Sequence, residues 1–218
     1  DAFLKSQRPI FKKLKAAAEI TASMDEKDVG FRLGPRINAV GRLGHADKVI
    51  EAFLSEEPSA LILHMEKSNQ ERKEIQIKIV AEAKERARIY PNDPILFLGG
   101  NWHPGVVGIA ASKLAEEFWK PTWLFQSAEG KGKGSTRSIP GFDVTEAMNS
   151  AAHLFTKFGG HRAAGGFTFD LIHEEAIRSQ LIDYAENIRR RNPLQWESKV
   201  HYDCSLPSHL VNLPLAAV

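Results

Sequence analysis

Residues 130–143, with the sequence GKGKGSTRSIPGFD, concentrate small, basic and hydroxyl side chains. Their first ten residues contain three glycines, two lysines, one arginine and three hydroxyl side chains, and a Pro-Gly turn follows. Glycines let a backbone adopt positive φ and come close to a ligand. Lysine and arginine beside N–H and hydroxyl groups suit phosphate oxygens. Because the segment has no helical or strand period, it indicates either a phosphate-binding loop or a solvated basic surface loop.

The composition of the 218-residue chain fits a globular protein of one large or two small domains. Hydrophobic residues make up 43% of the chain and charged residues 26%, which is ordinary for such proteins. Because the net charge is only +2, any anion binding must depend on local positive charge.

Three features predict a cytoplasmic protein without membrane contact. The single cysteine, Cys204, excludes an internal disulfide framework and suits a reducing compartment. No apolar run approaches the ~18–20 residues of a membrane span, and the N-terminus lacks the apolar core of a signal peptide. Since the sequence starts at Asp1 and not at methionine, we expect a fragment or a processed chain.

A second basic segment, residues 31–44 (FRLGPRINAVGRLG), combines three glycines and a proline with three arginines and an asparagine. One interpretation is a Gly/Pro loop with solvated arginines. The other is an arginine-bearing loop that holds a phosphate through paired N–H donors. Composition alone leaves both interpretations open.

The first half of the chain predicts mainly helices. Apolar spacing predicts one helix over residues 3–20, interrupted at Pro9, and another over residues 45–54. His64 lies in an apolar run, residues 60–65, which indicates a packed histidine without a functional role. Residues 66–90 contain neither glycine nor proline and predict a helix of roughly 35–40 Å, more typical of a connector than of a site. The prolines at 91 and 94 end this helix and mark a domain boundary.

The second half alternates strands and helices, which predicts an α/β fold. Strands are expected at residues 95–98, 121–126 and 165–169, and helices at residues 106–119, 142–158 and 174–191. Residues 130–138 are expected to return as a strand at the sheet edge. Asp143, with Glu146 three residues later, is the expected N-cap of one helix, and a turn at residues 159–161 is expected to end it. Short β-like pieces are expected at residues 199–203 and 210–213.

The glycine turn at residues 99–105 lies between a predicted strand and a predicted helix. That order is how α/β proteins present a helix N-terminus to an anion, although no GxxxxGK[ST] motif is present. His103 in this turn either faces a substrate or caps the turn.

Several of these segments together resemble a known family. GSTRSIPGFD at residues 134–143 and FGGHRAAGG at residues 158–166 are similar to the DHH-type phosphoesterases, most closely the RecJ single-strand DNA exonucleases. GPRINAVGRLG at residues 34–44 and NWHPGVVGIAASKL at residues 101–114 resemble that family in the same order. The matching motifs extend over about residues 28–166.

The resemblance implies an α/β fold: a DHH-associated domain with a mixed sheet flanked by helices, preceded by a long connecting helix. It also implies a domain division. Residues 1–65 would be the end of a DHH catalytic domain with the arginine loop, residues 66–91 the connecting helix, residues 92–192 the DHH-associated substrate-binding domain, and residues 193–218 the start of a truncated OB-like domain.

The resemblance further implies roles for particular residues. His161, in a glycine-histidine turn that approaches the scissile phosphate, is the expected catalytic residue, where it would stabilise transition-state charge. Trp102 and Phe142 either stack on bases or belong to the core. The residues expected to bind substrate or phosphate are Arg36, Asn38, Arg42, His103, Ser135, Arg137, Ser138, Gly159 and Gly160.

The DHH family's own metal-binding signature, an Asp-rich strand end with Asp-His-His, is absent from the sequence. The resemblance therefore places Mn²⁺ or Mg²⁺ on a missing N-terminal half, with no metal site in this chain, and we expect the chain to be inactive alone. The implied activity is a 5′→3′ single-stranded-DNA exonuclease in DNA repair and recombination. Its implied partners are single-stranded DNA, a single-strand-binding protein and a helicase.

Two other functions stay open from the sequence. One is a DHH-family phosphatase or oligoribonuclease that acts on short RNA or nucleoside phosphates. The other is a catalytically silent module that binds nucleic acid or acts as a scaffold. The long helix at residues 66–90 and the β-like pieces after Pro193 favour the exonuclease.

Overall fold

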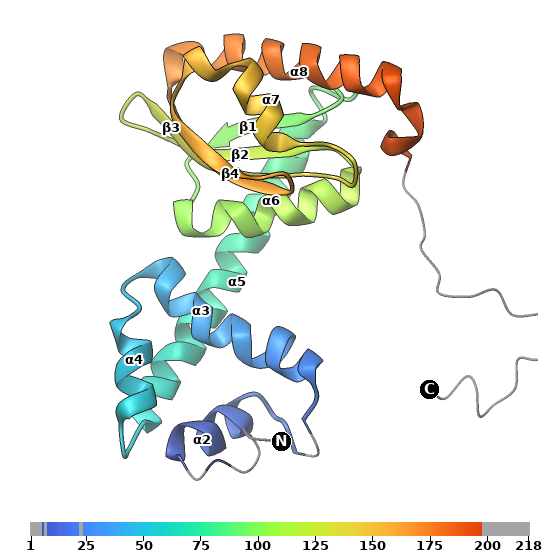
Figure 1. The fold of residues 1–218 in the computed structure, drawn as a ribbon. Helices are drawn as coiled ribbons and strands as arrows, with labels where there is room; N and C mark the ends of the chain where they lie inside the picture. The colour runs from blue at the N-terminus through green and yellow to red at the C-terminus, as the bar shows by residue number, and fades with distance from the viewer. Residues whose placement is uncertain (1–5, 7, 22–23, 198–218) are drawn as a thin grey trace, which may run out of the picture.

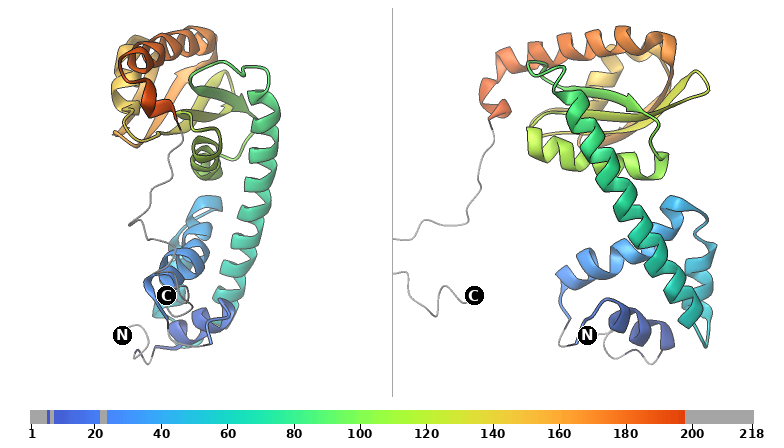
Figure 2. Two further views of the ribbon diagram at one scale, coloured as in Figure 1. Left: turned by 90° about the vertical axis from the view of Figure 1, so that its right-hand side faces the viewer. Right: turned by 180° about the vertical axis from the view of Figure 1, so that it is seen from behind.

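The computed structural model describes residues 6, 8–21 and 24–197, which form two units joined by one long helix (Figures 1 and 2). The first unit is entirely helical. Its elements are α2 (Pro9–Ala17), the π-helix η1 (Asp28–Leu33), α3 (Gly34–Leu43) and α4 (Asp47–Leu54). The connecting helix α5 (Ser59–Ala87) starts in this unit and ends beside the second.

The second unit is a five-stranded mixed sheet with the strand order β1-β2-β3-β5-β4. β1 is parallel to β2, and the other neighbouring strands are antiparallel. The strands are β1 (Leu96–Gly100), β2 (Thr122–Ala128), β3 (Lys131–Arg137), β4 (Phe155–His161) and β5 (Ala164–Asp170). The helices are α6 (Pro104–Phe118), α7 (Val144–Ser150) and α8 (Glu174–Arg191), with short 3₁₀ turns η2 (Ala152–Leu154), η3 (Leu171–His173) and η4 (Pro193–Trp196).

Helices cover both faces of this sheet, which confirms the predicted α/β fold with a mixed sheet flanked by helices. One face packs against α6 and the end of α5, through residues such as Leu98 and Leu124. The other face packs against α7 and α8, through an aromatic cluster that includes Phe97, Phe125 and Phe169. In Figures 1 and 2, α6 lies between the sheet and the first unit.

The connecting helix begins earlier than predicted, at Ser59 and not at residue 66, so the apolar run at residues 60–65 belongs to it. Its 29 residues span about 43 Å. Ile62 and Met65 contribute to the core of the first unit, while Ile79 and Ala83 contribute to the core of the second. The helix therefore stabilises both units and also fixes their separation.

The prediction of a loop at residues 31–44 was wrong, because the segment forms η1 and α3. Pro35 lies in the first turn of α3, where a missing N–H costs no hydrogen bond. Leu33, Ala39 and Val40 are buried on one side of the segment, and this burial outweighs the poor helix propensity of its glycines. Pro9 begins α2, and residues 3–5 and 7 of the helix predicted before it lie outside the described residues.

The prediction of a helix over residues 142–158 was also wrong beyond its first two turns. α7 ends at Ser150, and β4 then carries the sequence FTKFGGH as an edge strand. The glycine-histidine sequence therefore ends a strand, and the turn of the β4–β5 hairpin is at residues 162–163. Phe155 and Phe158 pack against the core on the α7 side, which explains why this segment joins the sheet.

Two smaller predictions were tested by the same region. Asp143 is the N-cap of α7, since its Oδ1 accepts hydrogen bonds from the N–H groups of Thr145 (2.8 Å) and Glu146 (3.1 Å). The predicted edge position of residues 130–138 was wrong, because β3 lies between β2 and β5 in the middle of the sheet. The closing helix α8 has the predicted bounds.

The β-like pieces predicted at residues 199–203 and 210–213 lie outside the described residues. Among the helices of the described part, none combines the length and the apolar character that crossing a membrane requires.

Candidate nucleic-acid interface

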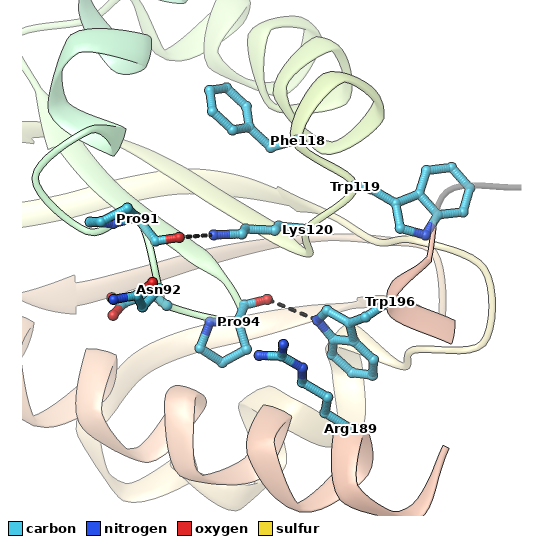
Figure 3. Close-up of a pocket in the computed structure, with 9 residues that line it drawn as sticks. Pro91, Asn92, Pro94, Phe118, Trp119, Lys120, Arg189 and Trp196 are labelled. Carbon is cyan, nitrogen blue, oxygen red and sulfur yellow. Dashed lines mark hydrogen bonds between the residues drawn. The ribbon is translucent and has the colours of Figure 1, made fainter. Parts of the chain in front are cut away.

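A pocket of about 330 Å³ lies at the C-terminal end of α8, and Figure 3 shows its lining. Lys120 Nζ donates to the carbonyl oxygen of Pro91 (2.9 Å), and Trp196 Nε1 donates to that of Pro94 (3.2 Å). These bonds tie η4 and the segment after α6 to the turn before β1. None of the site residues predicted from the sequence lines this pocket; the basic ones among them lie elsewhere.

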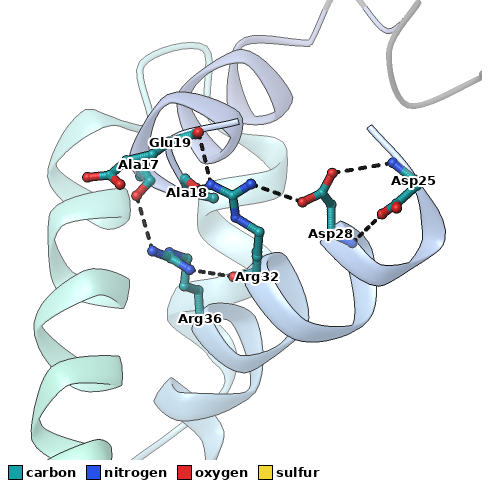
Figure 4. Close-up of polar contacts among 7 residues, drawn as sticks. All are labelled: Ala17, Ala18, Glu19, Asp25, Asp28, Arg32 and Arg36. Carbon is teal, nitrogen blue, oxygen red and sulfur yellow. Dashed lines mark hydrogen bonds and ion pairs between the residues drawn. The ribbon is translucent and has the colours of Figure 1, made fainter. Parts of the chain in front are cut away.

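Arg36 lies within the first unit and is engaged by protein acceptors (Figure 4). Its Nε donates to Glu66 Oε1 (2.6 Å), its Nη1 to the Arg32 carbonyl oxygen (2.6 Å), and its Nη2 to the Ala17 carbonyl oxygen (3.2 Å). These bonds join α2, η1, α3 and α5. The geometry therefore favours a structural role for Arg36 over the phosphate-binding role expected from the sequence.

Arg137, the last residue of β3, lies half-buried against α6. Its Nε donates to Ser112 Oγ (3.0 Å) and its Nη1 to the Thr136 carbonyl oxygen (2.8 Å). Its Nη2 lies against Gly108, where a Cβ atom would come within 3.1 Å. Burial, and next the charge of Arg42, lowers the pKa of Arg137. A guanidinium remains protonated despite such a shift, so the site holds a positive charge that its partners do not neutralise.

Arg42, which belongs to the first unit, also contacts α6. Its Nη1 donates to the Gly105 carbonyl oxygen at the start of α6 (3.3 Å), and its own carbonyl oxygen occupies the space that a Gly105 side chain would need. The end of α3 thus rests directly on α6. Arg42 is exposed, so its guanidinium remains accessible from solvent beside Arg137.

His103 caps the turn before α6: its Nδ1 accepts a hydrogen bond from the N–H of Gly105 (3.1 Å). The N–H groups of Val106 and Val107 donate to the His103 carbonyl oxygen (3.0 and 3.2 Å). The first amides of α6 are therefore used within the protein, and Pro104 contributes none. The start of α6 does not offer the free N–H groups expected from the sequence.

The strand register places His161 and Arg137 on the same row of the sheet. Ala164 of β5 is paired with Arg137 on one side and with His161 on the other. Directly paired residues of antiparallel strands direct their side chains to the same face. The next row places Ser135, Gly166 and Gly159 side by side. This face is the one against which α6 packs at β2 and β3, because Leu124, which is buried under α6, is paired with Ser135.

Beyond β3 this face is open. Gly159, His161 and Gly166 are all exposed, whereas Leu124 on the same face is fully buried under α6. The tertiary structure therefore joins the expected site residues Ser135, Arg137, Gly159 and His161 into one surface, which we call the open sheet face.

Two lysines on the open sheet face were missed by the sequence analysis. Lys133 and Lys157 flank Thr168 in the third row, and both are exposed. Alternation along β3 links Lys133 to Ser135 and Arg137 and would have revealed it. Lys157 was hidden because its segment was predicted as a helix.

The remaining predicted residues have local structural roles. Ser138 Oγ donates to the carbonyl oxygen of Phe142 (2.8 Å) and so holds the turn before α7. Gly160 has φ +152°, and a side chain there would clash with the Ala164 carbonyl oxygen on β5. Asn38 is exposed on α3.

Stacking of bases on Trp102 or Phe142 is excluded in this conformation. Trp102 is 3% exposed and Phe142 1%, so both belong to the core, which was the alternative left open by the sequence. Trp102 Nε1 donates to Glu82 Oε2 (2.8 Å), and this bond is the main cause of the lowered pKa of Glu82.

Within the described residues, no group of three or more His, Cys, Asp or Glu side chains lies close enough to hold a metal ion. The described residues therefore do not fit a Mn²⁺ or Mg²⁺ site.

Comparison with known proteins identifies the second unit. A family model described as the DHHA1 domain matches residues 92–187, which are the sheet with α6, α7 and most of α8. The class of the protein follows: its second unit is a DHHA1 domain.

The relatives extend this match to the first unit. The single-stranded-DNA-specific exonuclease RecJ of Bacillus subtilis is 38% identical over 170 residues, which cover 75% of this chain and 22% of that protein. RecJ of Escherichia coli is 35% identical over 178 residues, covering 75% of this chain and 31% of that protein. The crystal structure of RecJ from Thermus thermophilus in complex with Mg²⁺ has a TM-score of 0.77 at 30% identity, covering 85% of this chain and 29% of that one.

The chain belongs to the RecJ family of the DHH phosphoesterases. It spans less than a third of the length of these curated relatives.

Proposed function

We propose that this chain is the substrate-binding part of a RecJ-like exonuclease that degrades single-stranded DNA from its 5′ end. The observation that carries the proposal is that Arg42 and Arg137, from different units, both lie against α6, Arg42 at Gly105 and Arg137 at Gly108. In the described part of the chain neither arginine forms an ion pair with a carboxylate. Two unneutralised guanidinium groups in one place suit a phosphate group.

From the site formed by Arg42 and Arg137, the bound DNA strand would extend across the open sheet face. Arg137 and His161 are two strand spacings apart, about 10 Å. A terminal phosphate held by Arg42, Arg137 and Ser135 therefore leaves His161 beside a phosphodiester further along the strand. Donation from the exposed His161 to the charge that develops on that phosphodiester would stabilise the transition state. Holding the end at a fixed distance from the reacting bond accounts for removal of nucleotides from an end.

A metal ion in such an enzyme supplies the activated water and stabilises the leaving oxygen, and the Thermus thermophilus RecJ structures contain Mg²⁺ or Mn²⁺. Since the described residues do not fit a metal site, we assign the ion to the part of RecJ proteins that this chain does not span. We expect the chain alone to bind DNA without cleaving it.

The wider setting follows from the family. We propose action in DNA repair and recombination in the cytoplasm, alongside a single-strand-binding protein and a helicase. We also propose that residues 1–65 complete a DHH catalytic domain, that residues 66–91 connect it to a DHHA1 domain at residues 92–192, and that residues 193–218 begin an OB-like domain.

The proposal predicts that the chain prefers a phosphorylated strand end. Binding of a labelled single-stranded oligonucleotide, with a 5′-phosphate or a 5′-hydroxyl, is measured by fluorescence anisotropy across a salt series. We expect tighter binding of the phosphorylated strand, with an affinity that falls as salt rises because counterions are released. A 3′-phosphorylated strand is the control. Equal affinity for all three ends would contradict the proposed end-binding site.

The open sheet face predicts a second, length-dependent effect. Binding to a long single strand is described by the slope of the logarithm of the binding constant against the logarithm of the salt concentration. Replacing Lys133 and Lys157 together with glutamine should reduce the magnitude of this slope by about 1.4, since each phosphate contact on a single strand contributes about 0.7. The affinity for a 5′-phosphorylated dinucleotide should remain unchanged, because a dinucleotide held at Arg42 and Arg137 is too short to reach the row of the open sheet face that contains Lys133 and Lys157. The matched control replaces the exposed lysines Lys12 and Lys48 of the first unit.

This experiment also separates the exonuclease from the alternative activity. A phosphatase or oligoribonuclease that acts on short substrates would bind the dinucleotide as tightly as the long strand. In that case the two lysine substitutions would change neither affinity, and the proposed strand path would be wrong.

A further inference from the structure

The middle of the connecting helix buries polar side chains. Towards its start α5 contributes apolar side chains to the core of the first unit, and towards its end to that of the second. Between these two regions the buried residues are Ser68, Asn69, Arg72 and Gln76. We call this group the polar band of α5. An arginine with only 9% exposure is the unusual member, because burying a charge is costly.

Arg72 is held by neutral groups. Its Nη1 donates to Gln76 Oε1 (2.8 Å) and its Nη2 to Asn69 Oδ1 (2.6 Å). Two amide oxygens fix the plane of the guanidinium but leave its charge unneutralised. Arg36 shows the contrast, because its guanidinium is paired with the carboxylate of Glu66.

Arg72 lies on α5, which packs against α3, the helix that carries Arg42, and against α6, which Arg42 and Arg137 both contact. Burial lowers the pKa of Arg72, and next the charge of Arg42 does so, as it does for Arg137. The charge of Arg42 therefore acts on both the buried Arg72 and the half-buried Arg137. In the described residues no carboxylate forms an ion pair with any of the three. Three positive charges that repel one another remain where the two units meet.

We propose that Arg72, positioned by Asn69 and Gln76, makes the site formed by Arg42 and Arg137 selective for a terminal phosphate over an internal phosphodiester. The inference rests on the proposed function. A phosphate monoester carries about −1.5 to −2 charges at pH 7, whereas an internal phosphodiester carries one. Three arginines match the dianion, and the dianion relieves the repulsion that the arginines exert on one another.

The sharpest test replaces Asn69 with aspartate. This isosteric change places a carboxylate where the amide oxygen already accepts from Arg72 Nη2, so it neutralises Arg72 within the protein. We expect the preference for a 5′-phosphate over a 5′-hydroxyl end to fall by about tenfold, the effect of roughly one charge-assisted hydrogen bond. Binding of the 5′-hydroxyl strand should change little. The control Gln70→Glu adds the same charge on the exposed side of the same helix and should keep the preference.

A second variant, Arg72→Met, removes the charge but retains much of the volume. We expect the same loss of preference, together with a higher thermal midpoint in the absence of ligand, because an unneutralised buried charge has been removed. Full retention of the 5′-phosphate preference in Asn69→Asp would overturn the inference even if Arg72→Met failed to fold.

These outcomes are distinguishable from failure of the proposed function. If the unmodified chain showed no preference for a 5′-phosphate, the proposed end-binding site would be wrong whatever Arg72 does. Suppose instead that the unmodified chain prefers the 5′-phosphate and that Asn69→Asp lowers the affinity for the 5′-phosphate and 5′-hydroxyl strands equally. Then only the selectivity assigned to Arg72 would be wrong.

Discussion

Replacing Arg137 with alanine is expected to weaken binding of a 5′-phosphorylated single strand by about 10- to 100-fold, the loss of one or two hydrogen bonds to a charged group. The 5′-hydroxyl strand should lose far less. Arg137 is the half-buried arginine that Ser112 Oγ and the Thr136 carbonyl oxygen orient along α6. Its hydrogen-bond partners among the described residues are neutral, so in the proposed complex the phosphate would neutralise its charge.

Fluorescence anisotropy with both oligonucleotides, measured at one salt concentration, tests this expectation. Arg88→Ala is the matched control, because Arg88 is an exposed arginine that already forms an ion pair with Glu85. Circular dichroism should show that Arg137→Ala keeps the native fold. An equal loss of affinity for the two strands would show that Arg137 contributes only to the general positive potential and does not hold the end.

Replacing Gly105 with alanine is expected to abolish most of the preference for the 5′-phosphate without unfolding the DHHA1 domain. The new Cβ atom would overlap the carbonyl oxygen of Arg42, so α3 and α6 must move apart. In active sites a misplacement of about 1 Å costs on the order of 100-fold in rate, and we expect a large loss here too because the two arginines would no longer reach the same phosphate. The domain itself should be no less stable, since alanine is favoured over glycine in a helix by about 1 kcal/mol.

The control for Gly105 is Gly41→Ala on α3, where the new Cβ would meet only the Cβ of Ala46 at an ordinary 3.5 Å. Thermal unfolding and oligonucleotide binding are measured for both variants. If Gly105→Ala bound the phosphorylated strand as tightly as the unmodified chain, the contact between α3 and α6 would have no role in the site.

The sequence predicted best where the physical signal is local. The closing helix α8 has the predicted bounds, with acidic Glu174 and Glu175 in its first turn and three arginines in its last, an arrangement that the helix dipole favours. Asp143 was identified as an N-cap because a capping carboxylate acts on N–H groups two and three residues away. Each of these features depends on a few neighbouring residues.

Errors arose where packing overrides local preference. Glycine and proline indicated a loop at residues 31–44, but burial of Leu33, Ala39 and Val40 makes the segment helical. Helical spacing was assigned to residues 142–158, although Phe155 and Phe158 pack as part of a strand. In both cases the deciding contacts come from elements distant in the sequence.

For the candidate site, too, the sequence indicated which residue types are involved, and the tertiary structure decided which of them lie together. Local chemistry and the family resemblance together proposed Arg42, Ser135, Arg137 and His161, because basic and hydroxyl side chains among glycines suit phosphate wherever they lie. Only the folded chain distinguishes the arginines from one another. Arg36 meets Glu66 and is neutralised, while Arg72 meets two amides and keeps its charge. That difference depends on which side chains other elements bring within a few ångströms, and no short stretch of sequence contains that information.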